Sequence, residues 1–315
     1  MQTRELPRLL DPRVRAQVNT YAESFARGEP FRHVVIDDFL DADYAQRLLA
    51  SFPPFECGNA RNEAGELGGK STVERIRELG APYAALDDLI QTRAFLDLVS
   101  RLTGIPDLLY DRFYFGGGTH ENRAGQDLDP HVDFNRHPIE QWHRRLNLIV
   151  YLNHDWRDSW GGLLELHSDP RAADDRISLI APLFNRCVIF ETTESSWHGF
   201  GRIAVAVDDE QRTRKSIALY FYTRERPLVE LADTHSTVYV DRPLPSRFQT
   251  GMTLAASDLD ELRTLLVRRD QHNQRLYRDL ADISKQLQEM KTALLGGPLG
   301  RLRYITARVL AKLRG

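Results

Sequence analysis

The chain has 315 residues, and its hydrophobic content of 42% is enough for a sizeable buried core in one large domain or in a domain with an appendage. Its formal net charge of −3 at pH 7 argues against a globally basic nucleic-acid binder. Charged residues such as Arg4 and Glu5 interrupt the start, no apolar run reaches 18 residues, and Cys57 and Cys187 form no disulfide or zinc pattern. These features are typical of a cytoplasmic protein without a signal peptide or a membrane-spanning helix.

The first third of the chain is predicted to support the core from outside. Residues 1–104 are expected to contain helices over 12–27, 42–51 and 82–103, a strand over 31–39 and a loop over 54–72. Gly28 and Pro30 would end the first helix, and Asp41 would cap the second.

Two histidines and one aspartate form the pattern that carries chemistry. His131 and Asp133 would share one face of an extended segment, because side chains alternate with period two along a strand. His198 follows after several apolar runs that are punctuated by turn residues. Two imidazoles and one carboxylate are the facial triad that holds non-haem iron and leaves positions open for small molecules. A second triplet, His167-Ser168-Asp169, is rejected because Asp169 precedes a proline in a loop-like run.

A basic residue and a hydroxyl follow the second histidine of this pattern. Arg214 and Ser216 lie at the start of the apolar run 214–222, which is typical of a strand. A guanidinium can bind a carboxylate through two parallel charge-assisted hydrogen bonds. We therefore expect Arg214 and Ser216 to hold the far carboxylate of a 2-oxo acid whose other end reaches the metal.

The stretch from about residue 105 to 226 resembles the Fe(II)/2-oxoglutarate-dependent oxygenases, and most closely their prolyl 4-hydroxylase branch. Tyr114-Phe-Gly-Gly-Gly-Thr-His120 resembles the strand and glycine turn before the family's His-x-Asp motif, and Tyr151-Leu-Asn-His-Asp-Trp156 resembles the segment after it. The resemblance implies His131, Asp133 and His198 as iron ligands, Arg214, Ser216 and Tyr151 around the 2-oxoglutarate carboxylate, and Tyr114 in the same pocket. It implies no catalytic side chain beyond the metal centre. The gap from His198 to Arg214 is longer than in the family, which leaves Arg212 as the alternative.

The same resemblance implies a mainly β fold, in which a double-stranded β-helix, or jelly roll, over residues 105–230 is flanked by helices. It implies Fe(II) as the cofactor, 2-oxoglutarate and O2 as co-substrates, and ascorbate as a candidate reductant. A peptidyl proline is the first candidate substrate. A sugar, lipid or nucleotide-linked molecule is the alternative, because Arg136, Arg144 and Arg145 would suit a phosphate group. Two rivals are a non-catalytic jelly-roll binding module and a cupin that needs no co-substrate, and the retained ligand set with Arg214 and Ser216 argues against both.

The end of the chain changes character. Residues 231–256 are expected to be a linker, and residues 257–315 a helical arm. Apolar residues between 262 and 294 are spaced alternately by four and three, with Asn273 in the same register. That spacing favours a coiled coil between copies of the chain over residues 257–295, with a helix folded back on its own core as the alternative. Residues 301–315 form a basic amphipathic tail without acidic residues, which would suit peripheral contact with an anionic membrane or docking on a protein.

Overall fold

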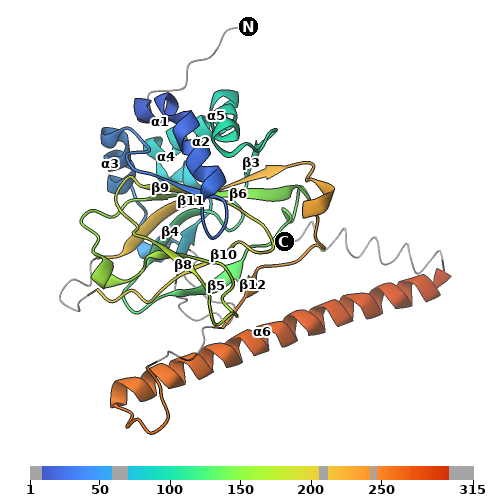
Figure 1. Ribbon diagram of the computed structural model, residues 1–315. Coiled ribbons are helices and arrows are strands. Elements are labelled where there is room, and N and C mark those ends of the chain that lie inside the picture. The colour runs from blue at the N-terminus through green and yellow to red at the C-terminus, as the bar shows by residue number, and fades with distance from the viewer. Residues whose placement is uncertain (1–8, 59–69, 206–211, 242–243, 245–246, 298–315) are drawn as a thin grey trace. The chain divides into compact units, whose positions relative to one another are not determined.

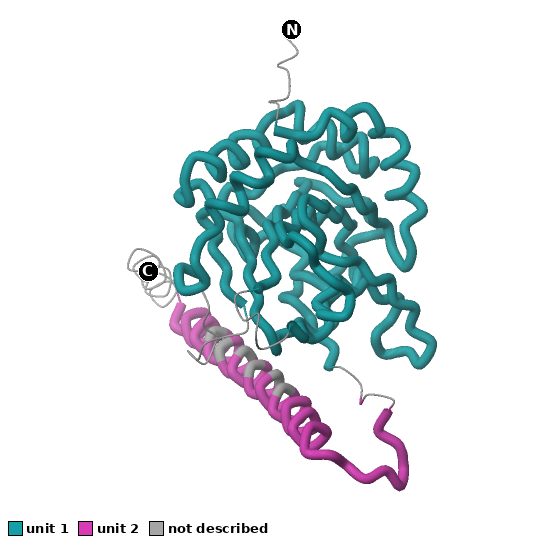
Figure 2. The backbone as a smooth tube through the Cα atoms, turned by 90° about the vertical axis from the view of Figure 1, so that its left-hand side faces the viewer, with its two compact units in different colours: residues 1–242 teal, residues 243–315 magenta. Residues whose placement is uncertain are grey.

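The computed structural model describes residues 9–58, 70–205, 212–241, 244 and 247–297 (Figure 1). The backbone separates into two compact units, residues 1–242 and residues 243–315 (Figure 2). The first unit takes in the expected support region 1–104 and the expected core 105–230. It also contains a short strand, β12, from the expected linker 231–256.

Two antiparallel sheets form the centre of the first unit. The larger sheet has the order β1-β9-β6-β11-β4-β2, with β3 paired to β11, and the smaller sheet has the order β12-β5-β10-β7-β8. The strands of the larger sheet are β1 (His33–Ile36), β2 (Ser71–Val73), β3 (Leu109–Tyr110), β4 (Gly118–Asn122), β6 (His143–Tyr151), β9 (Cys187–Glu191) and β11 (Arg214–Thr223). Those of the smaller sheet are β5 (Leu128–Val132), β7 (Leu164–His167), β8 (Ile177–Ile180), β10 (Trp197–Phe200) and β12 (Val238–Tyr239). The predicted mainly β jelly roll is confirmed.

Helices pack against the larger sheet, on the side away from the smaller one (Figure 1). They are α1 (Pro12–Ala16), α2 (Val18–Arg27), α3 (Ala42–Ala50), α4 (Ala81–Ile90) and α5 (Arg93–Thr103). Short 3-10 turns lie at Phe55–Cys57, Ile76–Leu79, Asp158–Trp160 and Leu228–Glu230. The predicted helix over 82–103 is divided because the Thr92 side chain accepts a hydrogen bond from the Phe95 amide and begins α5 as its N-cap. The predicted helix over 12–27 is likewise divided, at Gln17.

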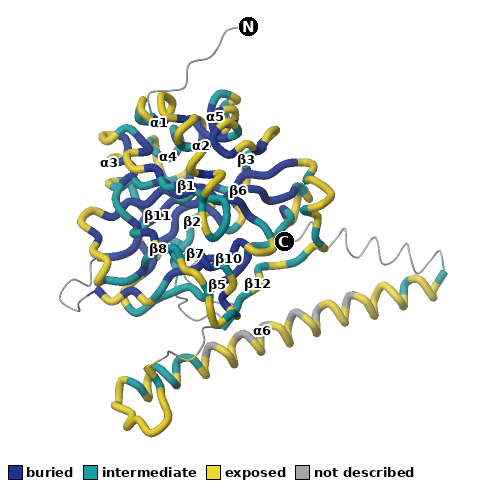
Figure 3. The backbone as a smooth tube through the Cα atoms, viewed as in Figure 1, coloured by how far each residue is buried: buried dark blue, intermediate teal, exposed yellow. Residues whose placement is uncertain are grey.

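Alternation along the central strands decides which residues reach the interior between the sheets. In β6, Leu146, Leu148 and Val150 pack into the core beneath the helices, whereas Asn147, Ile149 and Tyr151 face the other way and line a cavity. The same alternation in β11 places Arg214, Ser216, Ala218 and Tyr220 at that cavity. Both strands are buried on both faces, as the dark blue tube at the centre of Figure 3 shows.

The second unit contains one long helix, α6 (Ala256–Leu295). The predicted helical arm is therefore present. Much of the α6 tube is coloured as exposed in Figure 3. The exposed residues include apolar ones, among them Leu276, Leu280, Ile283 and Leu287. The basic tail 301–315 lies outside the described residues. In the described part of the chain, no helix combines the length and the apolar content that crossing a membrane requires.

Candidate metal centre

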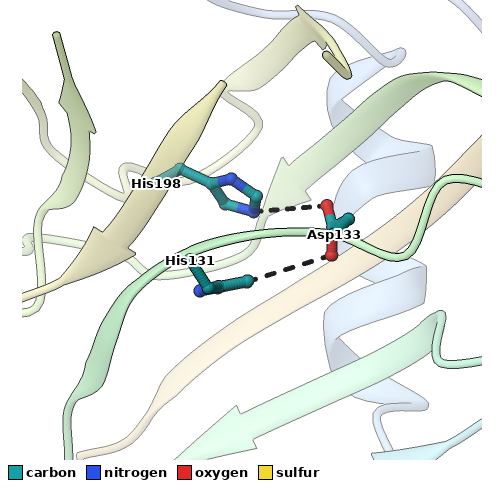
Figure 4. Close-up of side chains that lie close together, drawn as sticks. All are labelled: His131, Asp133 and His198. Atoms are coloured by element: carbon teal, nitrogen blue, oxygen red, sulfur yellow. Dashed lines mark ion pairs between the residues drawn. The ribbon is translucent and has the colours of Figure 1, made fainter. Parts of the chain in front are cut away.

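Pairing between two strands of the smaller sheet brings the two histidines together. His131 lies in β5 and His198 in β10, and the antiparallel register sets these two residues directly opposite each other. Their ring centroids are 4.3 Å apart. Asp133 follows β5 by one residue and turns its carboxylate toward both imidazoles (Figure 4). One nitrogen or oxygen atom from each of the three residues lies within 4.8 Å of the others, a spacing that one metal ion can bridge.

Hydrogen bonds orient both imidazoles for metal binding. His131 donates from Nδ1 to the Asp129 carbonyl, and His198 donates from Nδ1 to the Ser196 carbonyl, each at 2.9 Å. The lone pair is therefore on Nε2 in each ring, and these atoms lie 3.9 Å and 3.4 Å from the two Asp133 carboxylate oxygens. Burial, together with the neighbouring His198, lowers the pKa of His131 to about 3, and burial lowers the pKa of His198. Both rings are neutral at pH 7, which is the form that binds a metal.

Asp133 is held as a carboxylate by two residues of β6. Asn147 donates from Nδ2 to Oδ2 of Asp133 at 2.8 Å, and Arg144 approaches the same oxygen at 3.1 Å through Nη2. Burial alone would raise the pKa of the Asp133 carboxyl, but Arg144 and the other neighbours outweigh it and hold the pKa below its usual range. Asn147 was not among the site residues predicted from the sequence. Its spacing of four residues from Tyr151, on the same face of one strand, was the available signal.

A second cluster of predicted residues surrounds Arg214. Arg214 donates from Nε to the Gly162 carbonyl at 2.7 Å and from Nη2 to the Tyr151 hydroxyl at 3.3 Å. Gly162 has a φ of +66°, and a Cβ there would lie 3.3 Å from Arg214 Cδ and 2.9 Å from Ile203 Cγ1, so a larger residue would crowd the guanidinium. The Arg214 side chain also lies over the Phe200 ring at 4.3 Å.

The Arg214 guanidinium has no counterion among the residues that the structure describes. It is 4% exposed, and no carboxylate of the described residues forms an ion pair with it. Burial lowers its pKa, since desolvation disfavours the charged form. A buried cation without an anion is costly, and the carboxylate of a bound ligand would remove that cost. The alternative residue, Arg212, instead contacts the His154 carbonyl at 3.2 Å and the Trp160 ring, and it does not line the cavity.

One cavity of about 280 Å³ joins the two clusters. The triad, Arg214, Ser216 and Tyr151 all line it, and burial raises the pKa of Tyr151, so its hydroxyl stays protonated and can donate to a ligand. The donor set therefore fits Fe(II) beside 2-oxoglutarate.

The structure separates Tyr114 from the other predicted site residues. Its hydroxyl donates to Asp87 Oδ1 at 2.7 Å, and its ring packs in the core beneath the helices rather than at the cavity. The rejected triplet is separate as well. His167 binds Asp175 through Nδ1 at 2.6 Å and lies near Glu165, outside the triad.

Comparison with known proteins shows what the central part of the chain resembles. Residues 117–222 match the sequence model described as the 2OG-Fe(II) oxygenase superfamily. Solved structures similar to this chain include a prolyl hydroxylase in complex with a hypoxia inducible factor oxygen degradation domain peptide fragment from Trichoplax adhaerens. That match has 15% identity and a TM-score of 0.47, and it covers 67% of this chain and 90% of that one. No curated protein sequence matches the chain.

Two further structures are prolyl 4-hydroxylases. The one from Phytophthora capsici has 17% identity and a TM-score of 0.47, with coverage of 97% of this chain and 100% of that one. The one from Pseudomonas putida has 15% identity and a TM-score of 0.40, with coverage of 70% and 98%. The matched stretch 117–222 contains the whole triad together with Arg214. Residues 117–222 are therefore similar to the 2OG-Fe(II) oxygenase superfamily, whose members are dioxygenases that use Fe(II), 2-oxoglutarate and O2.

Proposed function

We propose that the protein is a hydroxylase in which His131, Asp133 and His198 bind Fe(II) while Arg214, Tyr151 and Ser216 hold the far carboxylate of 2-oxoglutarate. One observation carries the proposal. A single cavity is lined at one place by two neutral imidazoles and a carboxylate, and at another by a buried guanidinium that has no counterion in the described part of the chain. A binding module without oxidation chemistry has no need for both features together.

The residues of the chain bind and orient the reactants. When bound, iron supplies the oxidation that couples decarboxylation of 2-oxoglutarate to hydroxylation of a C–H bond. Arg214 neutralises the distal carboxylate, and the Tyr151 hydroxyl adds a hydrogen bond to it. Asn147 and Arg144 keep Asp133 ionised and fix its direction. Phe200, Leu164 and Ile149 line the same cavity and limit the entry of water.

Turnover of the co-substrate tests this function. The full-length protein, supplied with Fe(II), 2-oxoglutarate and O2, should release succinate, and a reductant such as ascorbate should sustain the release. The His198→Ala variant should release none, because two ligands do not hold the metal. Retention of the fold in the variant is checked by circular dichroism. Metal-free wild type that releases succinate as fast as the iron-loaded protein would contradict the proposal.

The first candidate substrate is a peptidyl proline, which the resemblance to prolyl 4-hydroxylases supports. The second candidate is a sugar, lipid or nucleotide-linked small molecule, and the cation Arg144 at the cavity would suit a phosphate group on it. Mass spectrometry of the host proteome with and without the enzyme separates the two. A gain of one oxygen atom on a proline supports the first candidate, whereas unchanged proteins together with a hydroxylated small molecule support the second.

The arm has a separate proposed role. The exposed apolar residues of α6 follow the 3.5-residue spacing of a coiled coil, and a second copy of the chain is the partner that this spacing suits. The basic composition of residues 301–315 supports contact with an anionic membrane surface at the end of the arm. In this arrangement the arm determines where the oxygenase unit works, and the cavity determines what it oxidises.

A further inference from the structure

Arg144 has donor capacity that the protein does not use. The residue is 1% exposed, and its Nε and Nη2 donate to Asn147 Oδ1 at 3.1 and 2.8 Å. The planar group lies between the Phe134 and Tyr220 rings, at 4.4 and 3.6 Å from their centroids. Its remaining nitrogen, Nη1, is buried and has no hydrogen-bond partner. A buried donor without an acceptor is rare in folded proteins, and Arg144 is one of the residues that line the cavity, where a ligand can supply the acceptor.

Lys70 is a second cation at the same cavity. It immediately precedes β2, the strand that pairs with β4 at the edge of the larger sheet, and it lines the cavity together with Arg144. No residue of the described part of the chain forms a hydrogen bond or an ion pair with Lys70. Burial lowers its pKa to about 8, with Asp133 and Glu74 acting to raise the value and Arg214 and Arg144 acting to lower it further. Lys70 is therefore still mostly protonated at pH 7.

The charge balance of the loaded cavity is positive. Among the described residues that line it, three are cations, Lys70, Arg144 and Arg214, and one is a carboxylate, Asp133, while His131 and His198 bind a metal as neutral imidazoles. Three positive charges against one negative charge leave two uncompensated. Fe(II) and doubly ionised 2-oxoglutarate carry equal and opposite charges, so binding both does not change this excess. Buried charge of one sign must be paired by an anion or removed by proton loss.

We propose that the substrate carries an oxyanion, a carboxylate or a phosphate ester, and that this group binds between Arg144 and Lys70. The inference rests on the proposed function, since it assigns the substrate class of the same site. Arg144 can donate to an oxygen of such a group through Nη1, and Lys70 adds a point charge. Arg144 and Tyr151 lie at opposite ends of β6, so the oxyanion would be held apart from the 2-oxoglutarate carboxylate at Arg214. Anchoring the substrate in this way would orient its C–H bond at the metal.

Binding of small oxyanions to the loaded protein tests the inference without turnover. The full-length chain is saturated with Ni(II), in place of iron, and with 2-oxoglutarate, and it is then titrated with methyl phosphate or with propionate by calorimetry at constant ionic strength. At least one of the two should bind to the wild type with one site per chain. Lys70→Met should weaken this binding about tenfold or more, the loss expected for one hydrogen bond to a charged group.

Three comparisons separate a specific subsite from a general effect of charge. Lys70→Arg should restore most of the oxyanion affinity, and Lys285→Met, which removes an exposed lysine of α6, should leave it unchanged. The affinity for 2-oxoglutarate should be the same in all the variants to within about twofold, because Arg214 is intact.

Two results would overturn the oxyanion subsite. One is a wild type that binds 2-oxoglutarate but neither small oxyanion, and the other is a Lys70→Met variant that binds them as tightly as the wild type. A wild type that fails to bind Ni(II) and 2-oxoglutarate would refute the proposed function itself, and the subsite with it. The titrations of metal and co-substrate come first, so the two failures are distinguished.

Discussion

Replacing Arg214 with methionine is the most direct probe of the co-substrate site. The guanidinium is buried, held by Gly162 and Tyr151, and without a carboxylate partner in the described part of the chain. Removing one member of a buried, hydrogen-bonded charge pair costs about 2–5 kcal/mol of binding free energy. At about 1.4 kcal/mol per factor of ten, the Kd for 2-oxoglutarate should rise between about 30-fold and several thousand-fold.

Thermal unfolding with Ni(II) in place of iron measures this effect without turnover. A ligand present at about 100 times its Kd stabilises the folded protein by about 2.7 kcal/mol. If the Kd rises 30-fold or more, the same 2-oxoglutarate concentration should stabilise Arg214→Met by less than about 1 kcal/mol. The unfolding temperature without 2-oxoglutarate is recorded in parallel, so that a loss of stability in the variant is not mistaken for a loss of binding.

Arg212→Met is the matched control, because it removes the neighbouring arginine of the same segment. The Arg212 side chain contacts the His154 carbonyl and the Trp160 ring, so its loss should leave the stabilisation by 2-oxoglutarate intact. The reasoning is refuted if Arg212→Met abolishes that stabilisation while Arg214→Met retains it. Such a result would mean that Arg212, two residues before β11, binds the co-substrate in place of Arg214.

Four further predictions concern the metal, its support, the oxyanion and the arm. His198→Ala should abolish Fe(II) binding in anaerobic calorimetry, and retained affinity would show that the distal ligand is misassigned. Asn147→Ala should weaken metal binding by about 10–100-fold through the loss of its hydrogen bond to Asp133, and an unchanged metal Kd would exclude that support. The affinity of the Ni(II)- and 2-oxoglutarate-loaded protein for sulfate, used here as the oxyanion, should fall as the pH rises through about 8. The lowered pKa of Lys70 leaves its ammonium charged below that pH and neutral above it. An affinity for sulfate that stays constant from pH 6.5 to 9 contradicts this prediction. Deleting residues 257–315 should leave 2-oxoglutarate turnover intact but reduce the number of chains per particle measured by light scattering. The same number of chains per particle in the full-length and truncated proteins would contradict the coiled-coil hypothesis.

The spacing of residues along the sequence was sufficient to predict several residues of the site. The His-x-Asp spacing places two ligands on one face of an extended segment whatever surrounds it, because the strand repeat is two residues. The same repeat links Arg214 to Ser216, and the 3.5-residue spacing in residues 262–294 is sufficient to predict a long helix. These features depend on neighbours within a few positions, so the sequence by itself determined them.

Tertiary structure decided the properties that depend on long-range pairing. The register between β5 and β10 sets His198 opposite His131, and no local spacing specifies that register. The packing of helices against the larger sheet draws the Tyr114 hydroxyl to Asp87, away from the cavity where the resemblance alone would place it. Lys70 comes from a segment without a recognisable motif, yet the pairing of β2 with β4 brings it to the cavity. Charge compensation is a property of the whole enclosed space, so the excess of cations over carboxylates among the described residues of the cavity became visible only in the folded chain.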